Sequence, residues 1–396
     1  MTADVSPMPR EETRDSLVNN PAVRSAVIQI VLVVSIFAFG WWLVSNTARN
    51  LAALNISSGF GFLDARAGFD IAQLPIEYSN NSTYGRAILV GLTNTLIVAG
   101  TGIAFATILG FIVGIGRLSH NVLVRSVSTV YVEVFRNLPP LLVILFWYFG
   151  VLAVLPLPRN AIELPFSSYI SNRGLQTPIA VFEQGAWVAG VVALIGIVAT
   201  IALSRMNRRR QMATGERRSI LLPALGFIVG VPLIVFVLMG SPMSFELPQR
   251  GTFNLTGGFQ VRPEFLALFL ALSVYTASFI AEIVRAGILS VSKGQNEAAA
   301  ALGLRRGLAL RLIVVPQAFR VIIPPLTSQF LNLTKNSSLG LAIGYPELVA
   351  VGSTVLNQSG QSVEVVVIWM TVYLGISLTV SFLMNLFNRK MALVER

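Results

Sequence analysis

The feature that most constrains this chain is a series of long apolar blocks separated by polar or charged segments. A bilayer core about 30 Å thick needs roughly 20 apolar residues in a helix to cross it, and the blocks have that length. Hydrophobic residues make up 54% of the sequence and charged residues only 12%, against about 25% charged residues in a typical soluble domain. The sequence therefore predicts an all-α, polytopic bundle of transmembrane helices.

We predict about eight spans, all helical, because lipid offers the backbone no hydrogen-bond partner. The expected spans are 26–44, 89–115, 127–155, 186–203, 221–239, 263–284, 312–351 and 363–387. The third should kink at Pro139 and Pro140, since proline donates no backbone hydrogen bond. The seventh is too long for one simple helix, so we expect a helix followed by a broken or re-entrant piece around Lys335.

The distribution of basic residues predicts the orientation of the chain. With the N-terminus placed inside, the inner segments hold well over half of the 29 Lys and Arg residues, as cytoplasmic segments of membrane proteins do. We therefore expect an even number of spans with both termini cytoplasmic. This orientation accounts for the net charge of +11 without nucleic acid, and no basic face is interleaved with exposed aromatic residues.

Several kinds of chemistry are excluded by residues that are missing or rare. The sequence has no cysteine and a single histidine, His120, so we expect no metal site and no resident cofactor. A phosphate-binding loop needs a lysine directly after a glycine, and none of Lys293, Lys335 and Lys390 follows one. The chain therefore has no Walker loop, and we do not expect it to be an enzyme.

The strongest local signal follows the sixth span, where residues 295–303 read Gln-Asn-Glu-Ala-Ala-Ala-Ala-Leu-Gly. Residues 297–302 are strong helix formers, mostly with small side chains. The carboxylate of Glu297 suits a helix N-terminus, and Gly303 can adopt the left-handed conformation that ends a helix. We predict a short docking helix within reach of a cytoplasmic protein, with an ordinary interfacial helix as the alternative.

At this segment the sequence resembles the permeases of bacterial ABC importers. Their signature loop is matched by Glu297, Ala298, Ala299, Gly303, Ile313 and Pro316. Val315 stands where the family usually has leucine. Flanking residues resemble the polar amino-acid branch, the histidine and glutamine type. The extra first span and the central insertion look most like the larger permease of general L-amino-acid importers, the AapQ or BztB type.

The resemblance implies the type I ABC-importer architecture and the import of L-amino acids, polar or broad in range, across a bacterial inner membrane. It implies that the loop at 286–311 couples this chain to a separate ATPase, present in two copies, which alone uses ATP. It also implies a second, related permease and a periplasmic amino-acid-binding protein that delivers the substrate. An ion-coupled secondary amino-acid transporter is the alternative, and it would need acidic coupling-ion sites near the membrane midplane.

We expect the chain to consist of a tail, a core in two parts and an insertion. The predicted divisions are a cytoplasmic tail at 1–25, an extra span and periplasmic loop at 26–85, the first part of the permease core at 86–156, a two-span insertion at 157–262, and the second part of the core at 263–396. An arginine-rich loop, Arg205 to Arg218, lies inside the insertion. Gly110 and Gly114 form a spacing typical of closely packed membrane helices.

Two Glu-x-x-Arg pairs lie in or near the predicted spans: Glu133 with Arg136, and Glu282 with Arg285. A spacing of three places each pair on one helix face, within ion-pairing reach. Because charge in hydrocarbon is costly, both pairs should face the bundle interior or the inner interface. Together with Asn137, they are candidates to line or gate the substrate path. The alternative is that each arginine only neutralises its glutamate.

Lys335, Asn336, Ser337 and Ser338 are the remaining candidates for the wall of the path. They lie where the seventh helix is expected to break, and broken helices near the midplane often form transporter sites. Their ammonium, amide and hydroxyl groups could bind the charged ends of an amino acid. A purely structural hairpin is the alternative, and the sequence leaves both open.

Overall fold

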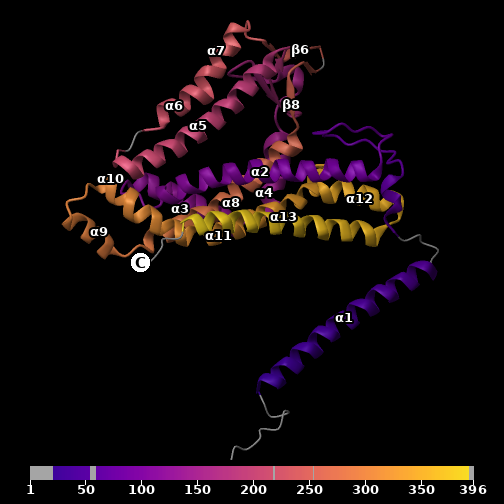
Figure 1. The fold of residues 1–396 in the computed structure, drawn as a ribbon. Coiled ribbons are helices and arrows are strands. Elements are labelled where there is room, and N and C mark those ends of the chain that lie inside the picture. The colour runs from indigo at the N-terminus through magenta and orange to yellow at the C-terminus, as the bar shows by residue number, and fades with distance from the viewer. Residues whose placement is uncertain (1–20, 54–58, 217–218, 253, 392–396) are drawn as a thin grey trace, which may run out of the picture.

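The computed structural model describes residues 21–53, 59–216, 219–252 and 254–391. Nearly all of the predicted tail at 1–25 therefore lies outside the described residues, as do Arg217 and Arg218. Helices dominate the described part of the chain (Figure 1). They are α1 (Pro21–Ala53), η1 (Phe60–Asp64), α2 (Tyr84–Gly116), α3 (Val122–Asn137), α4 (Pro140–Leu145), η2 (Phe146–Leu152), η3 (Pro158–Asn160), α5 (Ala186–Thr214), α6 (Leu221–Leu225), η4 (Gly226–Gly230), α7 (Val231–Leu238), α8 (Pro263–Leu289), α9 (Lys293–Ala301), α10 (Arg306–Ala309), η5 (Leu310–Val314), α11 (Val315–Asn336), η6 (Ser337–Ile343), α12 (Leu348–Ser359) and α13 (Ser362–Met391).

The predicted number of spans is confirmed. Within the described residues, 7 helices are long and apolar enough to cross a membrane, or up to 8 if one bent pair forms a single span. The bent pair is α3 with α4 and η2, which turn by 110° at Pro139. The expected kink of the third span is therefore a full change of direction, because the helix ends at Asn137 and a new one begins at Pro140.

The centre of the bundle is the contact between α2 and α8, with α11, α12 and α13 packed beside them (Figure 1). Gly110 and Gly114 face α8, as their spacing predicts. A Cβ atom at Gly110 would lie 2.6 Å from the Cβ of Ile280, and one at Gly114 would lie 2.7 Å from the carbonyl oxygen of Ala281. Only glycine allows the two backbones to approach this closely.

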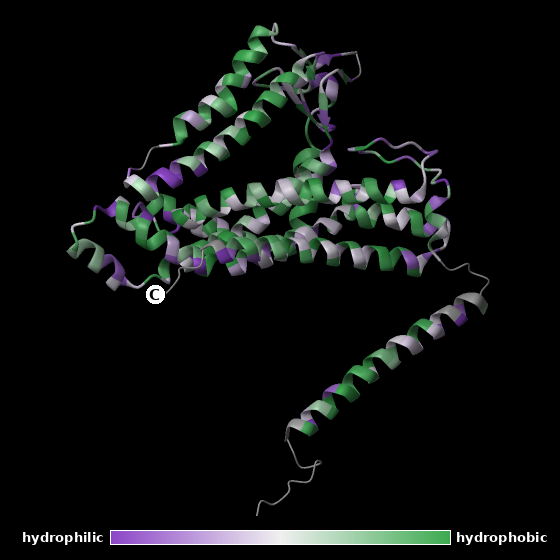
Figure 2. Ribbon diagram, in the orientation of Figure 1, coloured by the Kyte–Doolittle hydropathy of each residue, from purple (hydrophilic) through white to green (hydrophobic). Residues whose placement is uncertain are grey.

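Two parts of the chain stand away from this bundle. Helix α1 has no buried residue in its candidate span and lies apart from the other helices in Figure 1. Helix α5 packs against α7 and η4 to form a hairpin, and at Gly196 a Cβ atom would lie 2.0 Å from the carbonyl oxygen of Phe227. The hairpin helices consist largely of hydrophobic residues (Figure 2), and many of these side chains are exposed, as expected of helices that face lipid.

Short strands close the base of this hairpin. They are β1 (Ile162–Leu164), β2 (Ser168–Ser171), β3 (Gly174–Thr177), β4 (Ile179–Phe182), β5 (Met243–Glu246), β6 (Gln249–Arg250), β7 (Leu255–Thr256) and β8 (Phe259–Val261). One antiparallel sheet has the order β1-β2-β3-β8, and β4 pairs with β5. Because β3 pairs with β8, the chain just before the α5 hairpin meets the chain just after it. The sequence analysis did not predict these strands, and the all-α description holds for the spans.

The seventh span differs from its prediction. The helix does not break at Lys335: α11 continues through Pro324, Pro325 and Lys335, then passes into η6. The chain turns at Gly344, whose φ is 78°. Neighbouring helices can satisfy the backbone groups that a proline leaves free, so the two prolines do not end the helix. The left-handed glycine ends the span instead.

Candidate coupling helix and ion-pair cluster

The predicted docking helix is present as α9, directly after α8 leaves the bundle (Figure 1). It begins at Lys293, so the expected position of Glu297 at the helix N-terminus is wrong. Ser292 has the extended backbone of an N-cap residue, with φ −61° and ψ 142°, and helical structure starts immediately after it. Glu297 therefore lies in mid-helix, too far along for the helix dipole to act on its carboxylate strongly.

Gly303 ends α9 as the sequence predicts. Its φ is 70°, and its N–H donates to the carbonyl oxygen of Ala300 at 2.9 Å. No atom lies within 4 Å of the place where a Cβ atom would stand. Glycine is therefore required here by the backbone conformation, which costs other residues about 1–2 kcal/mol, and not by lack of space.

One face of α9 holds it to the rest of the chain. Ala299 is buried, with 1% of its surface exposed. The side-chain amide of Gln317 on α11 donates to Gln295 at 3.4 Å. Ile313 and Pro316, the last two signature positions, are partly buried in η5 and at the start of α11. These contacts hold α9 against η5 and the start of α11.

The opposite face of α9 is open. Glu297, Ala298 and Gly303 are exposed, and Leu302 beside them is 79% exposed. Small side chains leave the helix backbone accessible, while Leu302 offers apolar area and Glu297 a charge. Such a surface suits close docking of a protein partner. The signature residues thus fall into an anchoring set and an exposed set.

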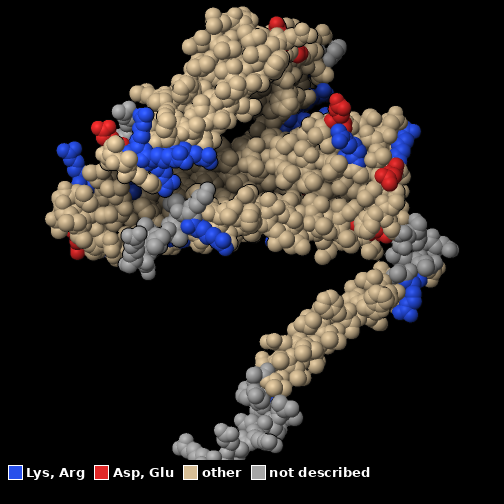
Figure 3. Space-filling view, in the orientation of Figure 1, with Lys and Arg blue, Asp and Glu red and all other residues tan. Residues whose placement is uncertain are grey.

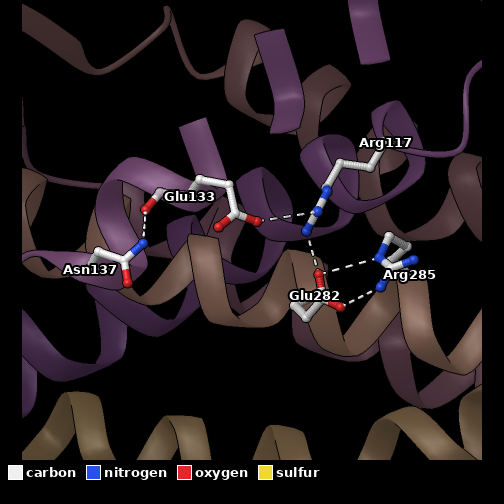
Figure 4. Close-up of polar contacts among 5 residues, drawn as sticks. All are labelled: Arg117, Glu133, Asn137, Glu282 and Arg285. Carbon is white, nitrogen blue, oxygen red and sulfur yellow. Dashed lines mark hydrogen bonds and ion pairs between the residues drawn. The ribbon is translucent and has the colours of Figure 1, made fainter. Parts of the chain in front are cut away.

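An ion-pair cluster joins three helices at the end of the bundle next to α9 (Figure 4). Arg117, the C-cap of α2, lies between two carboxylates, and its side chain is 11% exposed. Its Nη1 donates to Oε2 of Glu282 on α8, and its Nη2 lies 3.6 Å from Oε1 of Glu133 on α3. Arg285 also donates to Glu282, from Nη2 at 2.6 Å and from Nε at 3.2 Å.

Of the two predicted ion pairs, one is confirmed and one is wrong. Glu282 pairs with Arg285 at the expected spacing. Glu133 instead pairs with Arg117, and the guanidinium of Arg136 lies 5.5 Å from the ring centroid of Phe279. The amide of Asn137 donates to the backbone carbonyl of Glu133 at 2.6 Å. Helical spacing permits a pair but does not enforce it when a cation from another helix competes.

Arg117 is a functional candidate that was not predicted from the sequence, where it counted only as one of the basic residues of the inner segments. It directly follows the apolar block of α2, and the signal for it was present. Two intramembrane glutamates require cations, and an arginine at the neighbouring helix end could supply one. The structure shows that this single side chain links α2 to both α3 and α8.

The four candidates at 335–338 lie around the end of α11, far from this cluster along the helix axes. The hydroxyls of Ser337 and Ser338 donate to the carbonyls of Thr334 and Lys335 at 2.7 and 2.8 Å. Ser337 is fully buried, whereas Lys335 is exposed. The two serine hydroxyls thus donate hydrogen bonds to backbone carbonyl groups of their own helical segment. Of the four candidates, Lys335 and Asn336 therefore have the side chains best placed to bind a ligand.

A network of buried polar groups lies near the end of α2 opposite to Arg117. Asn94 donates to the carbonyl oxygen of Pro346 at 2.9 Å, and Tyr345 donates to the carbonyl oxygen of Asn94 at 3.0 Å. The N–H of Leu348 donates to Thr95 at 3.0 Å. These bonds attach the turn between η6 and α12 to α2, and buried polar networks of this kind fix one arrangement of helices.

Glu347 belongs to the same turn and is fully buried. Its carboxylate accepts the N–H groups of Val349 and Ala350 at 2.8 and 2.7 Å, which caps α12. Glu347 lies outside the candidate spans. Burial raises the pKa of its carboxyl group to about 7, although the two N–H bonds and the hydroxyl of Tyr373 act in the opposite direction. Its burial was not predicted from the sequence.

Nothing in the described residues suggests a metal site, since they contain no group of three or more His, Cys, Asp and Glu side chains able to hold an ion. The clustered carboxylates, Glu133 and Glu282, are instead bound by arginines. Their arrangement can transmit force between helices or control the inner end of a path.

Comparison with known proteins places the chain among transport components. Residues 212–393 match the family described as binding-protein-dependent transport system inner membrane component. The general L-amino acid transport system permease protein AapQ of Rhizobium johnstonii is 59% identical over 381 residues, covering 96% of this chain and 95% of the relative.

Two further relatives are similar over almost their full lengths. A putative amino-acid ABC transporter permease protein of Escherichia coli, YhdX, is 50% identical over 379 residues, covering 95% of this chain and 96% of the relative. The glutamate/glutamine/aspartate/asparagine transport system permease protein BztB of Rhodobacter capsulatus is 43% identical over 412 residues, covering 96% of each chain. All three are permease subunits by name, and none is described as an enzyme or an ion-coupled transporter.

Proposed function

The chain belongs to the amino-acid ABC transporter permeases, the inner-membrane components of binding-protein-dependent transport systems, and from this we propose that it imports L-amino acids under the drive of a separate ATPase docked on α9. It is a multi-pass membrane protein and a transport subunit rather than an enzyme. The relatives give no support to the ion-coupled alternative. A polar or broad substrate range is proposed because one relative is named for general L-amino acids and another for four polar ones.

The proposed assembly contains two copies of the ATPase, a second related permease and a periplasmic amino-acid-binding protein. The lack of a lysine directly after any glycine supports ATP hydrolysis on another subunit. The excess of arginine at one end of the spans supports cytoplasmic termini. In this orientation α9 and the ion-pair cluster face the cytoplasm, and the strands of the insertion face the periplasm.

Force on α9 would reach the bundle through two connections. The chain passes from α8 to α9 across only three residues, Ser290 to Ser292, so a displaced α9 pulls directly on α8. Glu282 on α8 binds Arg117, which also faces Glu133. We propose that this cluster makes the inner ends of α2 and α3 follow α8, and that Lys335 and Asn336 bind the substrate nearer the outer end of the path.

The observation that carries this proposal is the division of α9 into a buried anchor at Ala299 and an exposed face containing Glu297 and Gly303. The test is Glu297→Lys, which reverses a charge on the exposed face, and Gly303→Asp, which adds a side chain at a left-handed position. Glu163→Lys is the matched control, since Glu163 is exposed on the strands of the insertion.

Both α9 variants should lose most of the ATPase that co-purifies with wild type, and most ATP-dependent uptake, while membrane insertion is unchanged. The control should behave as wild type does. Normal ATPase binding and uptake by both α9 variants would remove the basis for docking on this helix.

A further inference from the structure

The last turns of α5 carry an exposed basic surface that the transport mechanism does not use. Arg205, Arg208, Arg209 and Arg210 are all exposed, and Figure 3 shows basic side chains gathered where α5 ends. Arg205, Arg208 and Arg209 share one helix face, because residues three and four apart are neighbours.

The length of α5 places these arginines at a defined depth. The helix has 29 residues, or about 44 Å at 1.5 Å per residue, whereas the apolar core of a bilayer is about 30 Å thick. Trp187, at the other end, is 71% exposed and is of the type that lies at membrane interfaces. Measured from Trp187, Arg205 lies at about 27 Å and Arg209 at about 33 Å, which is the level of the opposite headgroups.

Exposed arginines at the other end of the α5 hairpin, among the strands, have hydrogen-bond partners within the chain. Arg173 donates to Asn254 at 2.8 Å, and Arg250 donates to the carbonyl oxygen of Ala161 at 3.0 Å while its guanidinium faces Tyr169. These cations hold the strands of the insertion together. Within the described residues, by contrast, no carboxylate forms an ion pair with Arg205, Arg208 or Arg209. Their charge therefore remains available to an external anion.

We propose that Arg205, Arg208 and Arg209 form a binding site for anionic phospholipid headgroups of the inner leaflet. Charge complementarity supports this occupant, since a cluster of cationic side chains directly beyond an apolar span attracts lipid phosphates. The apolar outer surface of α5 continues toward the hydrocarbon below the site, which suits a lipid and not a soluble partner. The site would anchor the hairpin, whose helices pack little against the core. This inference rests on the proposed orientation.

The test measures which lipid remains with the purified full chain after exchange into mixed micelles of equal phosphatidylglycerol and phosphatidylcholine. Wild type should be enriched in phosphatidylglycerol, and the enrichment should fall with added salt. Each arginine near the surface contributes about a fivefold preference, so Arg205→Gln with Arg209→Gln should lower the enrichment by up to about 25-fold. Arg205→Lys with Arg209→Lys preserves the charge and should retain most of it.

The matched control is Arg159→Gln with Arg262→Gln. It removes the same charge from exposed positions on the proposed periplasmic side of the membrane and should leave the enrichment in phosphatidylglycerol unchanged. Elution volume and protease protection verify that each variant folds in the same orientation, independently of transport. Equal enrichment in wild type and the α5 glutamine variant would overturn the lipid site, as would a loss in the lysine variant. Loss of co-purified ATPase with unchanged lipid would assign the surface to a protein instead.

Discussion

Replacing Arg117 with methionine tests the ion-pair cluster most sharply. Methionine keeps a flexible, unbranched side chain but removes the cation that joins α2 to Glu133 and Glu282. The pair with Glu133 contributes little, since that glutamate is 60% exposed and exposed pairs are worth about 0–1 kcal/mol. The contact with Glu282 involves side chains only 11% and 25% exposed, and a charged hydrogen bond of this kind contributes about 1.5–3 kcal/mol.

Arg285 continues to neutralise Glu282 in the variant, so the full cost of an unpaired buried charge does not arise. We therefore expect Arg117→Met to lower the free energy of unfolding by about 1.5–4 kcal/mol. Arg136→Met is the matched control. It makes the same chemical change to a residue that lies over Phe279 and forms no ion pair in the described residues, and it should cost about 0.5–1 kcal/mol.

The assay is reversible denaturant unfolding in one detergent, combined with a double-mutant cycle that adds Glu282→Gln. The two single changes should not add, with a coupling energy of at least about 1 kcal/mol. ATP-dependent uptake should fall while ATPase docking on α9 is unchanged. Equal destabilisation by Arg117→Met and Arg136→Met, with no coupling to Glu282, would refute the role of Arg117 as a connection between helices.

Two further predictions concern the outer half of the bundle. Lys335→Ala should change the apparent affinity for substrate or the preference between amino acids. Assembly should be retained, because the Lys335 side chain is exposed. Unchanged uptake kinetics for a panel of amino acids would show that Lys335 has only a structural role. Glu347→Gln should remove a pH dependence of the stability of the folded chain. The pKa of Glu347 is raised from 4.5 to about 7 in the folded chain, so the folded state keeps a proton that the unfolded state releases. Its contribution to stability is complete below about pH 4.5 and is lost as the pH rises to about 7. Thermal unfolding of wild type relative to Glu347→Gln at pH 5 and pH 8 measures this loss, and an identical difference at both values would contradict it.

Much of the architecture could be predicted because the bilayer imposes simple rules. Apolar length located the spans, and the glycine spacing in α2 predicted a close helix contact, which the structure shows to be with α8. The strands at the base of the α5 hairpin could not be predicted, because all of them are very short and two of the pairings, β3 with β8 and β4 with β5, join residues far apart in sequence. β3 pairs with β8 across the whole α5–α7 hairpin, and no local pattern records such a pairing.

The candidate site was predicted less completely. The α9 residues follow from local helix chemistry, and Gly303 ended the helix as expected. The start of α9 was missed because Ser292 gave a weaker signal than the glutamate that follows. The pairing of Glu133 depends on Arg117 from another helix. Helix ends meet through tertiary packing, so spacing along one helix could not decide between Arg117 and Arg136.

The central claim is that a separate ATPase drives amino-acid movement through α9. Its most direct test is uptake of labelled amino acids into vesicles that contain this chain and its partner permease, with the binding protein outside, measured with and without the ATPase and ATP. The account predicts uptake only when both are present, and loss of that uptake in Glu297→Lys. Sustained, concentrative uptake without the ATPase would contradict it.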